Sequence, residues 1–304
     1  MSRATEKVFK QFDAFMEENG NENMSEEELN GLFQKFMDQY NHNLPQQVTE
    51  KNAETADDFL ELAEDASNEA SALKYARKAL QLDPNNLDAE RMIAEITAAD
   101  ELDLLKKLES AIKHGTELME REGYMADDIG HFWGITATRP YMRLRQEYME
   151  TLKDCGMTRR AIAECEEMLR LCENDNLGVR YTLMHLYALM EEEQPALELH
   201  KKYDGHEETQ MLLPLSMLYF KQGQWEKAGD YLKRLSKANK DTKKFFRALK
   251  NDTLDQYIDQ MQEYGYRPFS IEELITELME NPEVFRSAPG YFRWADRQLI
   301  KKKK

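Results

Sequence analysis

Few residues in this sequence have the types and spacing that catalysis or metal binding needs. His206-Glu207 begins like the zinc-protease motif HExxH, but the next three residues are Glu208, Thr209 and Gln210, so the second histidine that would share the metal is absent. The sequence also contains no glycine-rich phosphate loop and no GxSxG nucleophile motif. We therefore expect a protein that is not an enzyme and carries no cofactor.

The three cysteines, Cys155, Cys165 and Cys172, allow two interpretations. Cys165 and Cys172 are spaced so that they could share a helix face and a metal ion. However, no pair has the CxxC spacing of a metal site, and Cys165 falls where two helices are expected to touch. We favour buried structural cysteines, no metal, and a reduced cytoplasmic compartment.

His131 lies beside two aromatic residues, Phe132 and Trp133. A histidine can act as a ligand or a base, but it needs a partner acid or cysteine, and none is near in the sequence. We favour structural packing for His131.

Composition limits the elements that can position these side chains. Hydrophobic residues make up 41 % of the 304 residues and charged residues 33 %, with a net charge of −17. Such an acidic chain is poorly suited to phosphate backbones, so nucleic-acid binding is not expected. The longest apolar stretch, residues 211–220, is far shorter than the roughly 20 residues that span a bilayer. The first residues show no positive charge followed by an apolar run, so we expect no signal peptide. We expect no membrane association.

Small residues recur at a regular interval along the chain, at Ala161, Ala196 and Ala228. The interval is close to the period of about 34 residues of tetratricopeptide (TPR) helix pairs. Apolar residues at helical spacing surround each alanine. The sequence therefore predicts an all-α fold, a TPR-like helix-pair solenoid with a helical head and a helical cap.

The predicted order has six parts: an acidic two-helix head over 1–40, a polar linker over 41–52 containing Pro45, TPR-like pairs over 53–121 with the second degenerate, an ordered aromatic insertion over 122–138, three TPR pairs over 139–242, and a C-terminal helical cap with a lysine tail over 243–304. Ser25 with Glu28 and Ser270 with Glu273 predict capping boxes. Pro214 predicts a helix that starts late or kinks.

Several unusual words occur in a fixed order between Gly130 and Tyr181: GHFWGI, TRPYMR, a GM-x-x-x-A-I turn, EEMLRL and NDN-x-GVRY. In these words the chain resembles a group of bacterial TPR proteins that share the signature with the suppressor-of-tumorigenicity protein family. That group is defined by its architecture. The resemblance therefore implies a helical-repeat interaction protein and no particular reaction.

We expect the concave groove of the solenoid to bind a protein or peptide, as a scaffold or adaptor would. Counting along the repeat places nine residues on the groove, with Arg143 and Tyr181 partly exposed: Arg143, Gln146, Glu150, Tyr181, His185, Leu213, Met217, Phe220 and Lys221. A mixture of aromatic, Met and long polar side chains is typical of interaction surfaces. In the alternative arrangement, the terminal helices fold back and fill the groove. The alternative function is a peptide-responsive intracellular regulator with an N-terminal output domain.

Two charged features complete the pattern. Lysines and arginines are concentrated over 233–250, which we interpret as a solvent-facing helix near a solenoid end, with contact to nucleic acid or an acidic partner as the alternative. The Asn174-Asp175-Asn176 word is expected to form the turn between two pairs, with Arg180 bonding to turn carbonyls and with ligand contact as the alternative. The oligomeric state is left open.

Overall fold

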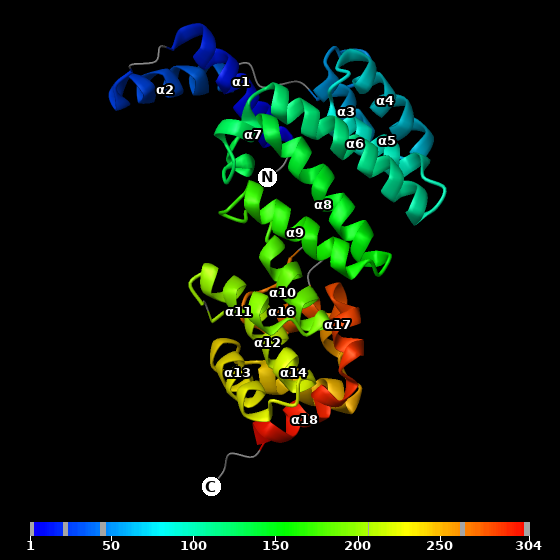
Figure 1. Cartoon of the computed structure of the whole chain (residues 1–304). Helices are drawn as coiled ribbons and strands as arrows, with labels where there is room; N and C mark the ends of the chain where they lie inside the picture. The colour runs from blue at the N-terminus through cyan, green and yellow to red at the C-terminus, as the bar shows by residue number, and fades with distance from the viewer. Residues whose placement is uncertain (1–2, 21–23, 43–46, 206, 262–264, 301–304) are drawn as a thin grey trace. The chain divides into compact units, whose positions relative to one another are not determined.

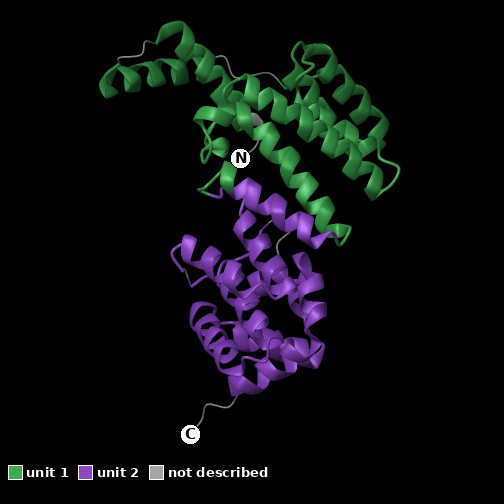
Figure 2. Ribbon diagram, in the orientation of Figure 1, with its two compact units in different colours: residues 1–156, 170–174 green, residues 157–169, 175–304 purple. Residues whose placement is uncertain are grey.

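The structure is a computed structural model that describes residues 3–20, 24–42, 47–205, 207–261 and 265–300. Helices make up 76 % of the chain, and no strand occurs within those ranges, so the predicted all-α class is confirmed. The chain divides into two compact units (Figure 2). Unit 1 comprises residues 1–156 and 170–174, and unit 2 comprises residues 157–169 and 175–304.

Within the described part of its first 156 residues, unit 1 contains eight α-helices and two short 3-10 turns (Figure 1): α1 (Arg3–Asn19), α2 (Glu26–His42), α3 (Ala56–Glu64), α4 (Glu69–Leu82), α5 (Leu87–Thr97), α6 (Glu101–Arg121), α7 (Tyr124–Asp127), η1 (Phe132–Gly134), η2 (Thr136–Thr138) and α8 (Arg139–Asp154). Consecutive helices pack on each other from α3 to α6, and α8 packs on α5 and α6. The N-cap side chains of Thr55, Asn68, Asn86 and Asp100 each accept a hydrogen bond from a first-turn amide, which fixes where α3 to α6 begin.

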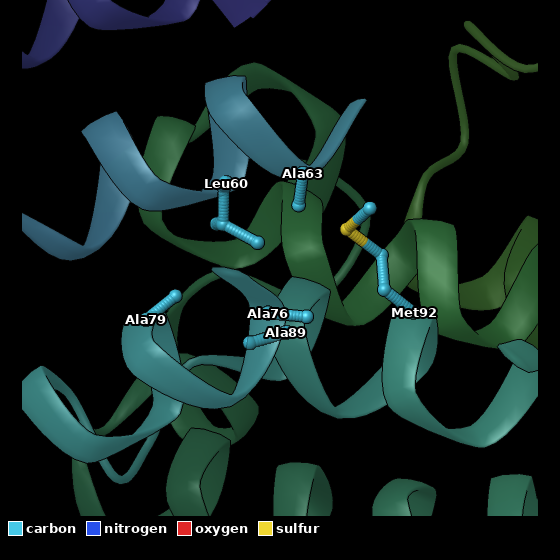
Figure 3. Packing of buried hydrophobic residues seen from close by; sticks show 6 residues of the cluster. All are labelled: Leu60, Ala63, Ala76, Ala79, Ala89 and Met92. Atoms are coloured by element: carbon cyan, nitrogen blue, oxygen red, sulfur yellow. The ribbon is translucent and has the colours of Figure 1, made fainter. Parts of the chain in front are cut away.

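Alanines allow the first helices of unit 1 to approach closely. Figure 3 shows the cluster that α3, α4 and α5 form, with Ala76 and Ala79 completely buried beneath Leu60 and Met92. Each alanine has only a methyl group to accommodate, so the helix backbones come near enough for the larger side chains to fill the remaining space.

The segment between α6 and α8 is held by its aromatic residues. Phe132 is fully buried, and its ring lies 6.2 Å from that of Tyr141. The Arg139 guanidinium lies over the Trp133 ring, 5.7 Å from its centroid. The side chain of His131, in contrast, is exposed, so the packing role predicted for it is wrong. Its two aromatic neighbours are the residues that turn inward.

Unit 2 contains the remaining helices, with the last two residues of α9 assigned to unit 1: α9 (Thr158–Leu171), α10 (Val179–Met190), α11 (Glu193–Lys202), α12 (Thr209–Lys221), α13 (Trp225–Ala238), α14 (Thr242–Asn251), α15 (Asp255–Ile258), α16 (Ile271–Glu280), α17 (Pro282–Ser287) and α18 (Pro289–Ile300). α10 packs on α11 and α12, and α12 packs on α13. The C-terminal helices then cover this group, because α16 contacts α12 and α14, α17 contacts α10, and α18 contacts α13 and α14.

Local signals in unit 2 were predicted with mixed success. Ala161, Ala196 and Ala228 are completely buried, as their recurrence suggested. The expectation of a late start at Pro214 is wrong, because α12 begins at Thr209 and continues through the proline. A proline in the second turn removes a single backbone hydrogen bond, and tight packing of this largely buried helix offsets the loss.

The two predicted capping boxes also differ. Ser25 and Glu28 form theirs, with the Glu28 carboxylate accepting from the Ser25 amide at 2.8 Å and the Ser25 hydroxyl accepting from the Glu28 amide at 3.3 Å. Ser270 caps α16 by accepting from the Glu272 amide at 3.1 Å. Glu273 does not close the second box as expected, because its carboxylate turns into the core of unit 2. None of the helices in the described part of the chain is long and apolar enough to cross a membrane.

Candidate functional site

Helix α1 has two faces that make different contacts within unit 1. Its apolar face packs on α2, where the rings of Phe12 and Phe15 lie 5.2 and 5.6 Å from that of Phe36. Its opposite face carries Glu6, Lys7 and Lys10, which form ion pairs with α3 and α8. The helix therefore joins the head to the helical array through charged groups.

Arg143, one of the predicted groove residues, is at the centre of these ion pairs. Its guanidinium donates to the Glu6 carboxylate at 2.7 Å and to the Asp88 carboxylate at 2.6 and 2.9 Å. Arg139 lies 3.7 Å from the same Glu6 oxygen. The Glu6 and Asp88 side chains are only 6 % and 4 % exposed. Two nearly buried carboxylates thus depend on two arginines of α8 for their neutralisation.

The pKa of Arg143 reflects this environment. Burial acts to lower it, but hydrogen bonds and charge from Asp88 and Glu6 outweigh burial and raise the pKa above its ordinary value. The side chain remains 20 % exposed, so the predicted partial exposure holds. The spacing of the repeat did not indicate that α1 of the same chain contacts Arg143.

The lysines of α1 bind the first turn of α3. Lys7 donates to Asp58 at 2.7 Å, and Lys10 donates to Asp57 at 2.7 Å. Asp58 also closes the capping box of α3 with Thr55. Burial tends to raise the pKa of Asp58, but the hydrogen bonds from Lys7 and from Thr55 dominate and lower the pKa to about 2. We call the five residues that receive α1 the α1 docking site: Asp57, Asp58, Asp88, Arg139 and Arg143.

Gln146 and Glu150 follow Arg143 along α8, as predicted. The Gln146 amide donates to the Glu150 carboxylate at 3.1 Å. Glu150 is exposed and Gln146 is half-buried. Of the three α8 residues predicted for the groove, only Arg143 takes part in the α1 docking site.

In unit 2, three predicted groove residues are buried in the core. Leu213 and Met217 on α12 are completely buried. His185 is also completely buried; its Nδ1 lies 2.8 Å from the Tyr181 carbonyl oxygen and its Nε2 lies 3.1 Å from the carboxylate of Glu277 on α16. These side chains are therefore not available to a partner while α16 stays in place.

Tyr181 lies at the start of α10 beside the predicted turn. The Arg180 guanidinium stacks 4.2 Å above its ring and donates to the Asp175 carboxylate at 3.0 Å. Burial raises the pKa of Tyr181 to about 12. Asp175 has the left-handed backbone expected of the turn, with a φ of 49°, and accepts from the Val179 amide at 2.7 Å. Arg180 thus binds the turn through a carboxylate and not through the carbonyl groups that we predicted.

Phe220 and Lys221 end α12, and Phe220 packs against α18. The Phe220 ring lies 5.4 Å from Tyr291 and 5.2 Å from Trp294 of α18. Lys221 donates to the carbonyl oxygens of Ala188 and Leu189 at 3.1 and 2.6 Å, and burial lowers its pKa. Both residues therefore have structural contacts within unit 2.

Sequence reasoning did not predict the internal contacts of two acidic residues. In unit 1, it did not single out Glu6. In unit 2, it assigned Glu273 to a helix cap, but the carboxylate accepts from Thr209 at 2.6 Å and from Asn239 at 3.2 Å, and burial raises its pKa. Several predicted groove residues are thus in contact with the chain's own terminal helices, as in the alternative arrangement. Among these internal contacts, the α1 docking site is the one that binds a helix mainly by charge.

The cysteines and histidines considered in the sequence do not form a second candidate site among the described residues. Cys165 and Cys172 are buried, Cys155 is half-buried, and all three are free thiols. Within the described ranges, no cluster of three or more His, Cys, Asp or Glu side chains is placed to hold a metal ion. His206, Pro45 and the lysine tail at 301–304 lie outside the described residues.

No protein-family model matches this chain, and a comparison with curated proteins finds none that is significantly similar to it.

Proposed function

We propose that this protein is a non-catalytic scaffold or adaptor, built from TPR-like helix pairs, which binds an amphipathic helix of a partner protein at the α1 docking site. The proposal rests on one observation: this surface already holds a helix, α1, through three sets of ion pairs. The free thiols agree with a cytoplasmic location, where cysteines stay reduced.

The docked α1 helix indicates what a partner helix must carry. Glu6 lies between two arginines, and Lys7 and Lys10 pair with two aspartates. A partner would therefore present a carboxylate, followed one and four residues later by cations, on one face of a helix. Charge-assisted hydrogen bonds of this kind fix the orientation of the partner as well as adding affinity.

The alternative function, a peptide-responsive regulator, is favoured by the same contacts. Helix α1 belongs to the head and occupies the docking site, so a partner that binds the site must displace α1. Ligand binding would then be linked to a change in the head, which a downstream protein reads. A DNA-reading head is not supported, since α2 begins with Glu26, Glu27 and Glu28.

The test is a competition between α1 and the same helix supplied as a peptide. A labelled peptide of residues 3–19 is titrated with the intact chain and with a chain that carries Glu6→Gln and Lys7→Gln. The tethered helix competes at an effective concentration in the millimolar range. We therefore expect the substituted chain to bind the peptide at least tenfold more tightly than the intact chain.

Matched controls use the same helix. A chain with Glu17→Gln, an exposed α1 position outside the docking contacts, should bind the peptide like the intact chain. A labelled peptide with Glu6→Lys should bind neither chain. Equal, weak binding of both peptides by every chain would contradict a helix-binding function at this site.

A further inference from the structure

A groove with an apolar floor and a basic rim lies between α13, α14 and α18 of unit 2. We call it the C-terminal groove; its volume is about 470 Å³, and the residues important here are Gly229, Leu232, Lys233, Lys237, Lys243 and Leu299. Leu232 is almost completely buried and Leu299 half-buried, whereas the three lysines are exposed. The groove therefore offers an apolar contact with cations around it.

Two of the three lysines on the rim of the groove have no ion-pair partner among the described residues. Lys233 pairs with Asp230 at 2.6 Å on its own helix. Lys237 and Lys243 form no ion pair and no side-chain hydrogen bond with any described residue. Residues 225–251 contain nine Lys and Arg but three Asp and Glu, in a chain whose net charge is −17. This local excess of positive charge suits an acidic occupant.

The head carries a surface of opposite charge. On α2, Glu26, Leu29 and Phe33 are spaced three and four residues apart and so lie along one stripe of the helix. Leu29 and Phe33 are each 43 % exposed, and Glu26 and Glu27 are exposed with no described partner. A hollow of about 350 Å³ beside this stripe is lined by aromatic side chains of α1 and α2. Exposed apolar side chains gathered in this way mark an interaction surface.

We propose that the protein associates with itself head to tail, with α2 of one copy lying in the C-terminal groove of a second copy. Leu29 and Phe33 would contact the apolar floor, and Glu26 and Glu27 would face Lys237 and Lys243. The lengths agree: Glu26 to Phe33 covers about 10.5 Å of helix and Gly229 to Lys237 about 12 Å. The occupant is a second copy because this chain itself supplies the acidic, apolar helix that the groove complements.

The geometry of this contact determines what forms. The two surfaces differ, so the contact is heterologous, and each associated copy still has a free head or a free groove. Association therefore continues beyond two copies, into a ring or an open chain. Because exposed ions make part of the contact, salt should weaken it. A nucleic acid as occupant is disfavoured, since no aromatic side chain is available in the groove for stacking on bases.

Analytical ultracentrifugation of the full chain tests the proposal. The wild type should sediment with an average mass that rises above 35.8 kDa as concentration increases. Lys237→Glu with Lys243→Glu reverses the charge of the groove, and Glu26→Lys with Glu27→Lys reverses the charge of the head. Each variant alone should associate at least tenfold more weakly than the wild type. Mixed in equal amounts, they should associate again, because the native head of one variant fits the native groove of the other and their reversed charges also attract each other.

A control variant makes the same lysine-to-glutamate change at two positions outside the groove. Lys78→Glu with Lys113→Glu, at exposed positions of unit 1 without a described partner, should associate like the wild type. Unchanged helical circular dichroism in all variants excludes misfolding. The proposal is overturned if the wild type stays monomeric over a concentration range of about a hundredfold. It is also overturned if either charge-reversed variant alone associates like the wild type, or if their mixture remains monomeric.

Discussion

Replacing Arg143 by alanine is expected to destabilise unit 1 by about 2–3 kcal/mol. The guanidinium neutralises the carboxylates of Glu6 and Asp88, at 2.7 and 2.6 Å, and both are more than nine-tenths buried. Removing one partner from a buried ion pair typically costs about 3–5 kcal/mol. We place this change below that range because Arg143 is 20 % exposed and Arg139 stays 3.7 Å from Glu6.

Urea unfolding followed by circular dichroism measures this loss, with the transition of unit 1 identified separately if the two units unfold in two steps. The matched control is Lys78→Ala, an exposed position on α4, which should change the free energy of unfolding by less than about 0.5 kcal/mol. Adding Glu6→Gln to Arg143→Ala should cost less than the sum of the two single changes, because the second change also removes a stranded charge. A loss as small as the control's for Arg143→Ala would refute the proposed burial of this network.

Three further changes test other parts of the structure. Ala76→Leu overfills the cluster of Figure 3 and should lower the free energy of unfolding by about 1–3 kcal/mol, whereas Lys78→Leu should be nearly silent in the same thermal melt. Asp58 has a folded pKa of about 2, below its unfolded value of 3.8, so its pair with Lys7 stabilises above pH 4. That stability should be lost as pH falls from 4 to 2, and Asp58→Asn should remove this part of the pH dependence of unfolding. Phe220→Ala removes a ring that contacts three other aromatic rings and should cost about 3 kcal/mol of stability in a denaturant titration.

Local patterns in the sequence were sufficient to predict most helices. The apolar spacing of Phe12 and Phe15 indicated the face that packs on Phe36. The recurring alanines marked positions where helices touch, and Ala161, Ala196 and Ala228 are all buried completely. Such features depend on residues three or four apart, so a single sequence contains the necessary information.

Contacts between distant charged residues could not be predicted in the same way. Glu6 and Arg143 are 137 residues apart. A charged helix face has the same sequence pattern whether it meets water or a second charged face. For that reason the pattern predicted the partial exposure of Arg143 but did not indicate that α1 contacts it.

Competition between local and tertiary contacts explains another error. Ser270 and Glu273 have the spacing of a capping box, but Thr209 and Asn239 offer Glu273 a buried set of donors. A capping contact at a helix end is worth about 1 kcal/mol, and several hydrogen bonds to one carboxylate outweigh it. The sequence around residue 270 carries no sign of these distant donors.

Hydrogen exchange of the α1 amides in the full chain tests the central claim most directly, namely that α1 occupies the docking site of unit 1. A helix held by the pairs of Glu6, Lys7 and Lys10 should exchange its amides at least a hundredfold more slowly than a free peptide of residues 3–19. Arg143→Ala should remove most of that protection, while Glu17→Gln should leave it unchanged. Exchange of α1 at the rate of the free peptide, with no response to Arg143→Ala, would contradict the account.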